Sequence, residues 1–534
     1  MKGARVVKEI QIRNFRSLKD TGLQTLSPIT LLVGENSSGK STFLRAFPLL
    51  KQSINKRTSG PILWAGDIDD YVDFGSFEET VTNDQSNTIV FRYRFCTNSL
   101  GALQRYIRYS RSTQDSLEEI RDDEIDFEIT ISSSKGRDYV SKFMLSVNST
   151  KVQFDLVERS VCIDGVLNHV EPNSHIAKNS VTKKSTVQHG YTTAESRAFG
   201  FVLPNIDVLW DELMKTLFGG ETEELSFYRV SDVVVELGNK LSRNEKISFI
   251  SKDDAKNPSW YINDYNRLAE SLLASNNSRM TEIIKLCYIY KIFSDIDLYI
   301  VSYFQNVHYI APLRATAERY YRLRNLAIDE VDYQGKNLAI FINSLTPRQL
   351  KAFRLWTNEH FGFSVQTDKS KGHLSLLINL ANANKAINLS DTGFGYSQVL
   401  PIITQLWELS TRKKENNKNI YLYEPLVPLV VAIEQPELHL HPAVQAKLAK
   451  AFIACIDLAR KNGYQLQLLL ETHSQTIVDY FGRAIARGVL SSKDVSVILF
   501  EKQYDSATTV VKNSFYDVDG YLNDWPYGFF DSEE

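Results

Sequence analysis

Residues 34–41 form a glycine-rich loop whose residue types suit the binding of a nucleoside triphosphate. The segment GENSSGKS matches the pattern G-x-x-x-x-G-K-[ST] in full. Backbone N–H groups of such a loop surround phosphate oxygens, the lysine reaches the β- and γ-phosphates, and the next hydroxyl can bind Mg²⁺. A chance glycine- and serine-rich turn is the alternative. The residues expected to bind ATP are Gly34, Glu35, Asn36, Ser37, Ser38, Gly39, Lys40, Ser41 and Thr42.

A carboxylate at the end of an apolar strand usually accompanies such a loop, because it helps to hold Mg²⁺. Residues 429–433 (LVVAI) are all apolar, and Glu434 follows them directly. We therefore expect Ser41 and Glu434 to be the Mg²⁺ ligands, with ATP and Mg²⁺ as the cofactors. A buried strand that simply ends in a surface glutamate is the alternative.

Four segments together resemble ABC-type ATPases of the SMC-like, OLD-family and related defence ATPases. They are the P-loop, residues 14–19 (NFRSLK), residues 434–442 (EQPELHLHP) and residues 468–474 (LLLETHS). The resemblance implies that His473, about forty residues after Glu434, is a switch histidine that contacts the γ-phosphate. Without this setting, a lone histidine would more often be structural.

A second glycine-bearing segment, residues 389–398 (LSDTGFGYSQ), precedes an apolar helical stretch. Glycines followed by Ser-Gln at a helix N-terminus offer N–H groups and a hydroxyl to phosphate. The resemblance implies a signature motif, which would cap the ATP of the partner in a head-to-tail dimer. A glycine-rich connector with a helix cap is the alternative. The residues expected in this role are Ser390, Gly393, Gly395, Ser397 and Gln398.

The loop after the acid strand departs from the family pattern at one chemically important position. Gln435 stands where the family has its catalytic glutamate. An amide cannot accept a proton as a general base, although a glutamine can orient a water. Glu437 is the nearest other carboxylate, two residues further on. We expect slow ATP hydrolysis, with Gln435, Glu437 and His473 as the catalytic or switch residues.

The elements that position these residues are far apart in the chain, since Gly34 and Glu434 are about 400 residues apart. Period-two alternation over 87–157 predicts antiparallel strands, and three-to-four spacing over 205–300 predicts helices, the first of them at 206–220. No heptad run long enough for a coiled coil is present. We predict an α/β fold, an ABC-type P-loop ATPase head split by a long insertion. Its expected parts are 1–85 (N-terminal lobe with the P-loop), 86–175 (small antiparallel β-sheet), 176–304 (helical arm) and 305–534 (C-terminal lobe with the signature, acid strand and switch histidine).

The composition is that of a soluble globular chain. The 534 residues are 43% hydrophobic and 23% charged, with a net charge of -3. The four cysteines lack metal-binding or disulfide-framework spacing. No apolar run approaches the roughly 18 residues of a membrane span, and the N-terminus has charges where a signal peptide needs an apolar core. We expect a cytoplasmic protein of about three domains, with no membrane partner.

Three segments, one of them within residues 434–442, resemble nuclease-free defence ATPases, including the PtuA subunit of Septu anti-phage systems, which also occurs beside retrons. They are 308–314 (HYIAPLR), 435–442 (QPELHLHP) and 525–531 (WPYGFFD). About sixty residues follow His473, too few for the Toprim nuclease domain of OLD-family proteins.

The signature motif, which caps the partner's ATP, implies a homodimer or higher even oligomer. The resemblance to defence ATPases implies that the chain senses infection and regulates a separate HNH endonuclease. It also implies retron RNA or DNA and a reverse transcriptase as further partners, and no nuclease activity in this chain. Two other hypotheses stay open: a nucleotide-locked scaffold with negligible hydrolysis, and a DNA-repair or recombination ATPase.

A basic segment interleaved with Tyr320 and Tyr321 is a candidate nucleic-acid contact, since arginines and aromatic rings suit phosphates and stacked bases. A solvated helix face with extended arginine stems is an equal alternative. The arginines concerned are Arg314, Arg319, Arg322 and Arg324.

Overall fold

The structure of the chain is a computed structural model. It describes residues 7–56, 58–67, 69–82, 87–96, 124–158, 160–164, 166–169, 224–251, 258–274, 278–322, 328, 330–370, 372–380, 385–412, 427–503 and 508–523. The helix expected at 206–220, Arg324 and the segment 525–531 lie outside these residues.

One large sheet is antiparallel and begins with the first strands of the chain. Its strand order is β10-β9-β8-β7-β6-β5-β1-β2, with β3 paired to β1. The strands are β1 Glu9–Phe15, β2 Leu18–Asp20, β3 Gln24–Thr25, β5 Thr88–Cys96, β6 Glu124–Ser134, β7 Arg137–Val147, β8 Thr150–Asp155, β9 Ser160–Ile163 and β10 Val166–His169. The strands expected between 87 and 157 are therefore present, and they continue the sheet that β1 starts.

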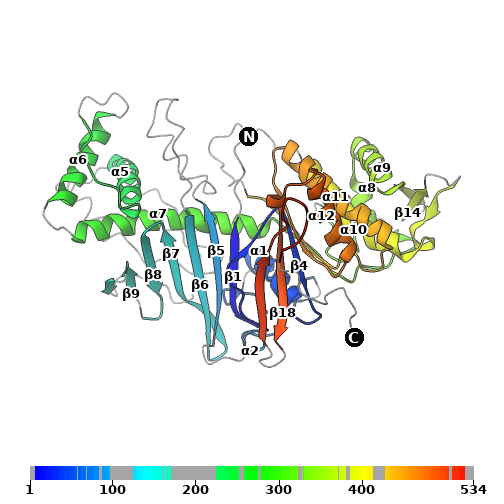
Figure 1. The fold of residues 1–534 in the computed structure, drawn as a ribbon, viewed down its shortest axis with the longest axis horizontal. Coiled ribbons are helices and arrows are strands. Elements are labelled where there is room, and N and C mark those ends of the chain that lie inside the picture. The colour runs from blue at the N-terminus through cyan, green and yellow to red at the C-terminus, as the bar shows by residue number, and fades with distance from the viewer. Residues whose placement is uncertain are drawn as a thin grey trace.

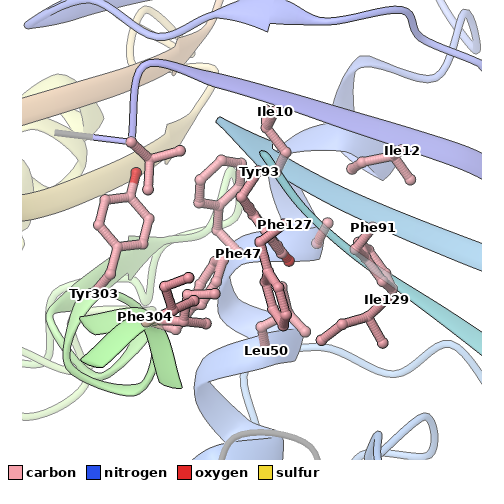
Figure 2. Packing of buried hydrophobic residues seen from close by; sticks show 14 of the residues in the cluster. Ile10, Ile12, Phe47, Leu50, Phe91, Tyr93, Phe127, Ile129, Tyr303 and Phe304 are labelled. Carbon is pink, nitrogen blue, oxygen red and sulfur yellow. The ribbon is translucent and has the colours of Figure 1, made fainter. Parts of the chain in front are cut away.

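Alternation along these strands buries one face of the sheet. Ile12 of β1 is opposite Phe91 of β5, and Phe91 is opposite Ile129 of β6. Every second residue of β6 from Ile125 to Ile131 is buried, as a half-covered antiparallel strand requires. Figure 2 shows this apolar row beside Phe47 of helix α1 (Lys40–Asn55). The sheet therefore packs directly on the helix that follows the P-loop.

A second sheet is mainly parallel and contains the P-loop strand. Its order is β11-β16-β17-β4-β18-β19, with all pairs parallel except β18 with β19. The strands are β4 Ile29–Gly34, β11 Val307–Ile310, β16 Leu429–Glu434, β17 Leu466–Glu471, β18 Val495–Gln503 and β19 Thr508–Ser514. β4, β16 and β17 are buried at every residue, because helices cover both faces of a parallel sheet. This explains their unbroken apolar sequences.

The long helix α7 (Ser278–Gln305) joins the two sheets. Its C-terminal Phe304 lies 6.0 Å, centroid to centroid, from Phe47 of α1 and 5.6 Å from Tyr93 of β5. In Figure 1, α7 crosses the antiparallel sheet and leads toward α5 (Glu224–Ser242) and α6 (Ser259–Leu273), which form a separate apolar cluster with it. The helical periodicity expected before residue 300 is borne out by these three helices.

A helical lobe covers the parallel sheet from the other side (Figure 1). It carries a small sheet of β12, β13, β14 and β15, and five helices. The elements are β12 Tyr321–Arg322, β13 Phe363–Ser370, β14 His373–Leu380, β15 Ile387–Asn388, α8 Leu338–Ser344, α9 Pro347–Phe361, α10 Phe394–Thr411, α11 Pro442–Lys461 and α12 Gln475–Ala486. No helix among the described residues is long and apolar enough to cross a membrane. The predicted mixed α/β class is confirmed.

Candidate nucleotide-binding site

The P-loop connects β4 to α1, and its two glycines are required by the close approach of neighbouring elements. A Cβ on Gly34 would lie 2.2 Å from the carbonyl oxygen of Phe500 in β18. Gly39 has a φ of +93°, and a Cβ there would lie 2.8 Å from both Leu18 and Ser17. A larger residue at either position would displace the loop, since such contacts are shorter than van der Waals distances and positive φ favours glycine. The elements packed around the loop therefore require both glycines.

Lys40 closes the P-loop on itself. Its ammonium donates hydrogen bonds to the carbonyl oxygen of Gly34, at 2.9 Å, and to that of Glu35. The side chain is only 3% exposed, and burial lowers the pKa of Lys40, while nearby carboxylates oppose that shift. Ser38 is fully buried, and its hydroxyl has no hydrogen-bond partner. A loop with a buried lysine and an unsatisfied hydroxyl suits an anion that brings its own acceptor oxygens.

Two strand ends place two carboxylates side by side at the edge of the parallel sheet. Glu434 ends β16 and Glu471 ends β17, and the two residues are paired in register. Ligands of open α/β sheets bind at this carboxyl edge. Because β17 lies between β16 and the P-loop strand β4, Glu471 is the carboxylate nearer to the P-loop.

Glu471 contacts the P-loop hydroxyl. Ser41 Oγ donates to Glu471 Oε1 at 2.8 Å, whereas Glu471 Oε2 is buried without a hydrogen-bond partner. Burial, followed by the charge of Glu434, raises the pKa of Glu471 to about 7. Glu471 was not among the predicted site residues. The signal that could have found it is the one that found Glu434: a carboxylate that ends an apolar run.

Glu434 has different partners. Arg45 Nε and Nη2 donate to its two oxygens at 2.6 and 2.7 Å, and the Tyr309 hydroxyl donates to Oε1 at 2.7 Å. The hydrogen bonds to Glu434 raise the pKa of Arg45. Ser41 and Glu434, predicted to share Mg²⁺, thus lie in one site but contact different residues.

Glu437 is bonded to the segment that carries His473. Its Oε1 accepts from the His473 backbone N–H at 2.7 Å, and its Oε2 accepts from Thr472 Oγ1 at 2.8 Å. Burial raises the pKa of Glu437. Burial, followed by the charge of Lys40, lowers the pKa of His473 to about 4, so its imidazole is neutral near pH 7. A neutral imidazole beside Lys40 can donate a hydrogen bond to a phosphate without adding charge.

Gln435 occupies a strained backbone position beside these groups. Its φ is +44°, which is uncommon for a residue with a Cβ and is often found at functional sites. Its backbone N–H donates to the carbonyl oxygen of Glu471 at 2.8 Å. The structure therefore brings Gln435, Glu437 and His473 together around the ends of β16 and β17.

Arg314 is not part of a nucleic-acid surface, which corrects the prediction for this residue. It is 5% exposed, and Nη2 donates to the backbone carbonyls of Glu434, at 2.9 Å, and Gln435, at 3.3 Å. Burial lowers its pKa to about 10. Arg319 and Arg322 are exposed, and Arg319 forms an ion pair with Asp391. A buried guanidinium that holds the end of β16 is a structural part of the site.

The expected signature segment divides into an exposed and a buried half. Gly393 is exposed, and a Cβ there would meet nothing within 4 Å. Gly395 is partly buried against the backbone of His439, and Ser390 hydrogen bonds to Asn388. The exposed half, with Gly393, precedes the first turn of α10.

The buried half lies inside α10. Ser397 donates to the carbonyl oxygen of Phe394 at 2.7 Å, and Gln398 is 1% exposed. The side chains of Ser397 and Gln398 are thus buried within the chain, whereas Phe394 in the first turn of α10 is 46% exposed.

The site fits a Mg²⁺ ion held together with a nucleotide. Mg²⁺ prefers oxygen ligands and is usually bound by one or two carboxylates plus phosphate oxygens. Ser41 Oγ and the unpartnered oxygen of Glu471 supply such ligands. Among the described residues, no group of three or more His, Cys, Asp or Glu side chains forms a metal cage. His441 caps α11 through Nδ1, which accepts from the Ala443 N–H at 3.2 Å.

Comparison with known families gives the class of protein. The mixed α/β fold and the P-loop are those expected for the head of a P-loop ATPase. The family model described as an AAA ATPase domain (AAA_15) matches residues 6–478, most of the chain. The chain belongs to this AAA ATPase domain family. No curated protein matches the chain.

Among solved structures, the chain is similar to the SMC head domain from Thermotoga maritima, with 8% identity and a TM-score of 0.33, over 95% of this chain and 98% of that one. It is also similar to the recombination mediator protein RecF with ATPrS, with 13% identity and a TM-score of 0.25, over 95% and 98%. A RecF–ATP structure has 12% identity and a TM-score of 0.24, over 97% of each chain.

Proposed function

We propose that this ATPase binds ATP with Mg²⁺, hydrolyses it slowly, dimerises around it, and regulates a partner HNH-type nuclease in anti-phage defence. The observation that carries the nucleotide part is the convergence of Lys40, Ser41 and the neutral imidazole of His473 with two carboxylates at one sheet edge. The defence part is supported by the sequence resemblance to nuclease-free defence ATPases.

Each residue has a distinct task in this proposal. The P-loop N–H groups and Lys40 bind the phosphates, and Lys40 exchanges its bonds to the Gly34 and Glu35 carbonyls for phosphate oxygens. Ser41 and Glu434 hold the metal, for which Arg45 must release an oxygen of Glu434. Mg²⁺ supplies charge neutralisation between the β- and γ-phosphates. His473 contacts the γ-phosphate.

Slow hydrolysis follows from the groups near the attacking water. Gln435 can orient a water but cannot remove its proton. Glu437 is a carboxylate, but both of its oxygens are engaged by Thr472 and by the His473 backbone. Bound ATP therefore persists, and the same features favour a second candidate, a nucleotide-locked scaffold in which ATP holds the assembly without turnover.

The dimer is proposed from the exposed first half of the signature segment. Gly393 presents open backbone at the N-terminal end of α10, where N–H groups and the helix dipole favour an anion. In a head-to-tail homodimer, this end would face the ATP of the other protomer. A higher even oligomer would repeat the same contact.

The proposal is tested with the purified full chain by ATP binding and turnover. Lys40→Ala is expected to abolish both, whereas the exposed Lys19→Ala is expected to change neither. Brisk turnover of the natural chain would exclude the scaffold. Stimulation by DNA ends would favour the DNA-repair or recombination hypothesis.

Affinity purification from the source cells tests the partners. Recovery of an HNH nuclease, with or without a reverse transcriptase and its RNA, supports the defence role. Its absence, together with DNA-stimulated turnover, would contradict that role.

A further inference from the structure

The two carboxylates at the sheet edge differ in what their oxygens already bind. Glu434 accepts three hydrogen bonds, two from Arg45 and one from Tyr309. Glu471 accepts one side-chain hydrogen bond, from Ser41, on Oε1. Glu434 is thus neutralised by an arginine, while Glu471 presents one oxygen that nothing satisfies.

That unsatisfied oxygen needs an explanation. Glu471 is 3% exposed and its Oε2 is buried without a partner. A buried carboxylate oxygen without a hydrogen bond or cation is costly, and such groups are rare in folded proteins. The neighbouring ammonium of Lys40 is held by backbone carbonyls, so it does not fill this role.

The geometry of Ser41 indicates which cation could be the partner of Glu471 Oε2. Its hydroxyl donates a hydrogen bond to Glu471 Oε1, so the lone pairs of Oγ remain available to a metal ion. A hydroxyl oxygen and a carboxylate oxygen from adjacent elements, completed by phosphate oxygens, form a ligand set typical of Mg²⁺.

We propose that Glu471, through Oε2, is a Mg²⁺ ligand of the nucleotide site together with Ser41. This assignment rests on the proposed ATP-binding function and adds a second carboxylate to the proposed metal ligands. Oε2 of Glu471 is free for the ion, whereas an oxygen of Glu434 becomes free only when Arg45 releases it.

The test uses the full chain, Mn²⁺ as the metal probe, and a fluorescent non-hydrolysable ATP analogue. The Kd of the analogue is measured in EDTA and in Mn²⁺, and the ratio of the two values reports the coupling between metal and nucleotide. The variants are Glu471→Gln, Glu434→Gln and, as a control, the exposed Glu359→Gln on α9.

Glu471→Gln is expected to reduce the coupling ratio roughly 10- to 100-fold. Its affinity in EDTA is expected to stay the same or to increase, because a negative charge near the phosphates is removed. Glu434→Gln is expected to reduce the ratio less than Glu471→Gln, and Glu359→Gln to leave it unchanged.

The possible failures are distinguishable. An unchanged ratio in Glu471→Gln overturns the assignment and leaves ATP binding intact. An equal loss of affinity in EDTA and in Mn²⁺ shows a structural role for Glu471 and also overturns it. If the natural chain binds no analogue under either condition, the proposed function itself fails, and the assignment fails with it.

Discussion

Arg45 binds both carboxylate oxygens of Glu434, at 2.6 and 2.7 Å, from the same helix that starts with the P-loop lysine. Bidentate arginine–carboxylate pairs are among the strongest polar contacts in proteins. This pair therefore joins the first nucleotide-binding element to the acid strand, which lies about 400 residues later in the chain.

Arg45→Gln is expected to lower the free energy of unfolding by about 2 kcal/mol. Glu434, 2% exposed, would be left with Tyr309 alone. A fully buried broken pair costs roughly 3–5 kcal/mol, and the 38% exposure of the Arg45 side chain reduces that value. Urea denaturation measures the change. The exposed Arg460→Gln is the control, expected to cost below about 1 kcal/mol, and an equal effect of the two variants would contradict the prediction.

Gln435→Glu is expected to raise kcat for ATP hydrolysis by about 100-fold or more, because a carboxylate can act as the general base that the amide cannot. The backbone position of Gln435 (φ +44°) is as accessible to glutamate as to glutamine, so the fold should be unchanged. Steady-state phosphate release measures the effect. Adding Lys40→Ala should remove the gained activity, and unchanged turnover in Gln435→Glu would count against this role for residue 435.

Gly393→Asp is expected to prevent ATP-dependent dimerisation without affecting folding. A side chain fits there, because a Cβ meets nothing within 4 Å, and a carboxylate would repel the phosphates of ATP bound to the other protomer. Light scattering with a non-hydrolysable ATP analogue measures the mass. Gly393→Asn is the neutral control and should still dimerise, and a Gly393→Asp protein that dimerises normally would refute the signature assignment.

Glu330 gives the stability of the chain a defined pH dependence. Burial alone would raise its pKa, but hydrogen bonds and charges from His308 and Lys51 outweigh burial and lower the pKa to about 2. Since the folded pKa is lowered, the contribution is complete above the unfolded pKa of about 4.5 and is lost as the pH falls toward about 2.

Glu330→Gln should therefore be less stable than the natural chain at pH 7, by about 1–2 kcal/mol. The difference should shrink between pH 4.5 and pH 2. Urea midpoints at pH 7, 4 and 3 measure it, with the exposed Glu359→Gln as the control. A difference that does not change with pH would show that the ion pairs of Glu330 do not contribute.

Local sequence determined the elements of the site. The P-loop glycines, the apolar runs of β4, β16 and β17, and the alternation of β5 to β8 each depend on neighbouring residues, so they could be predicted. Glu434, Gln435 and His473 were found because each follows an apolar strand or stands in a family motif.

Tertiary structure decided which of these residues meet. Parallel strands that are distant in sequence can be ordered in several ways, and only the fold shows that β17 lies between β16 and β4. That order brings Glu471 to Ser41 and leaves Glu434 to Arg45. The same packing buries Arg314 at the end of β16. From sequence alone, the charge of Arg314 placed it on the surface. Contacts between strand ends depend on sheet order, a non-local property that residue spacing does not encode.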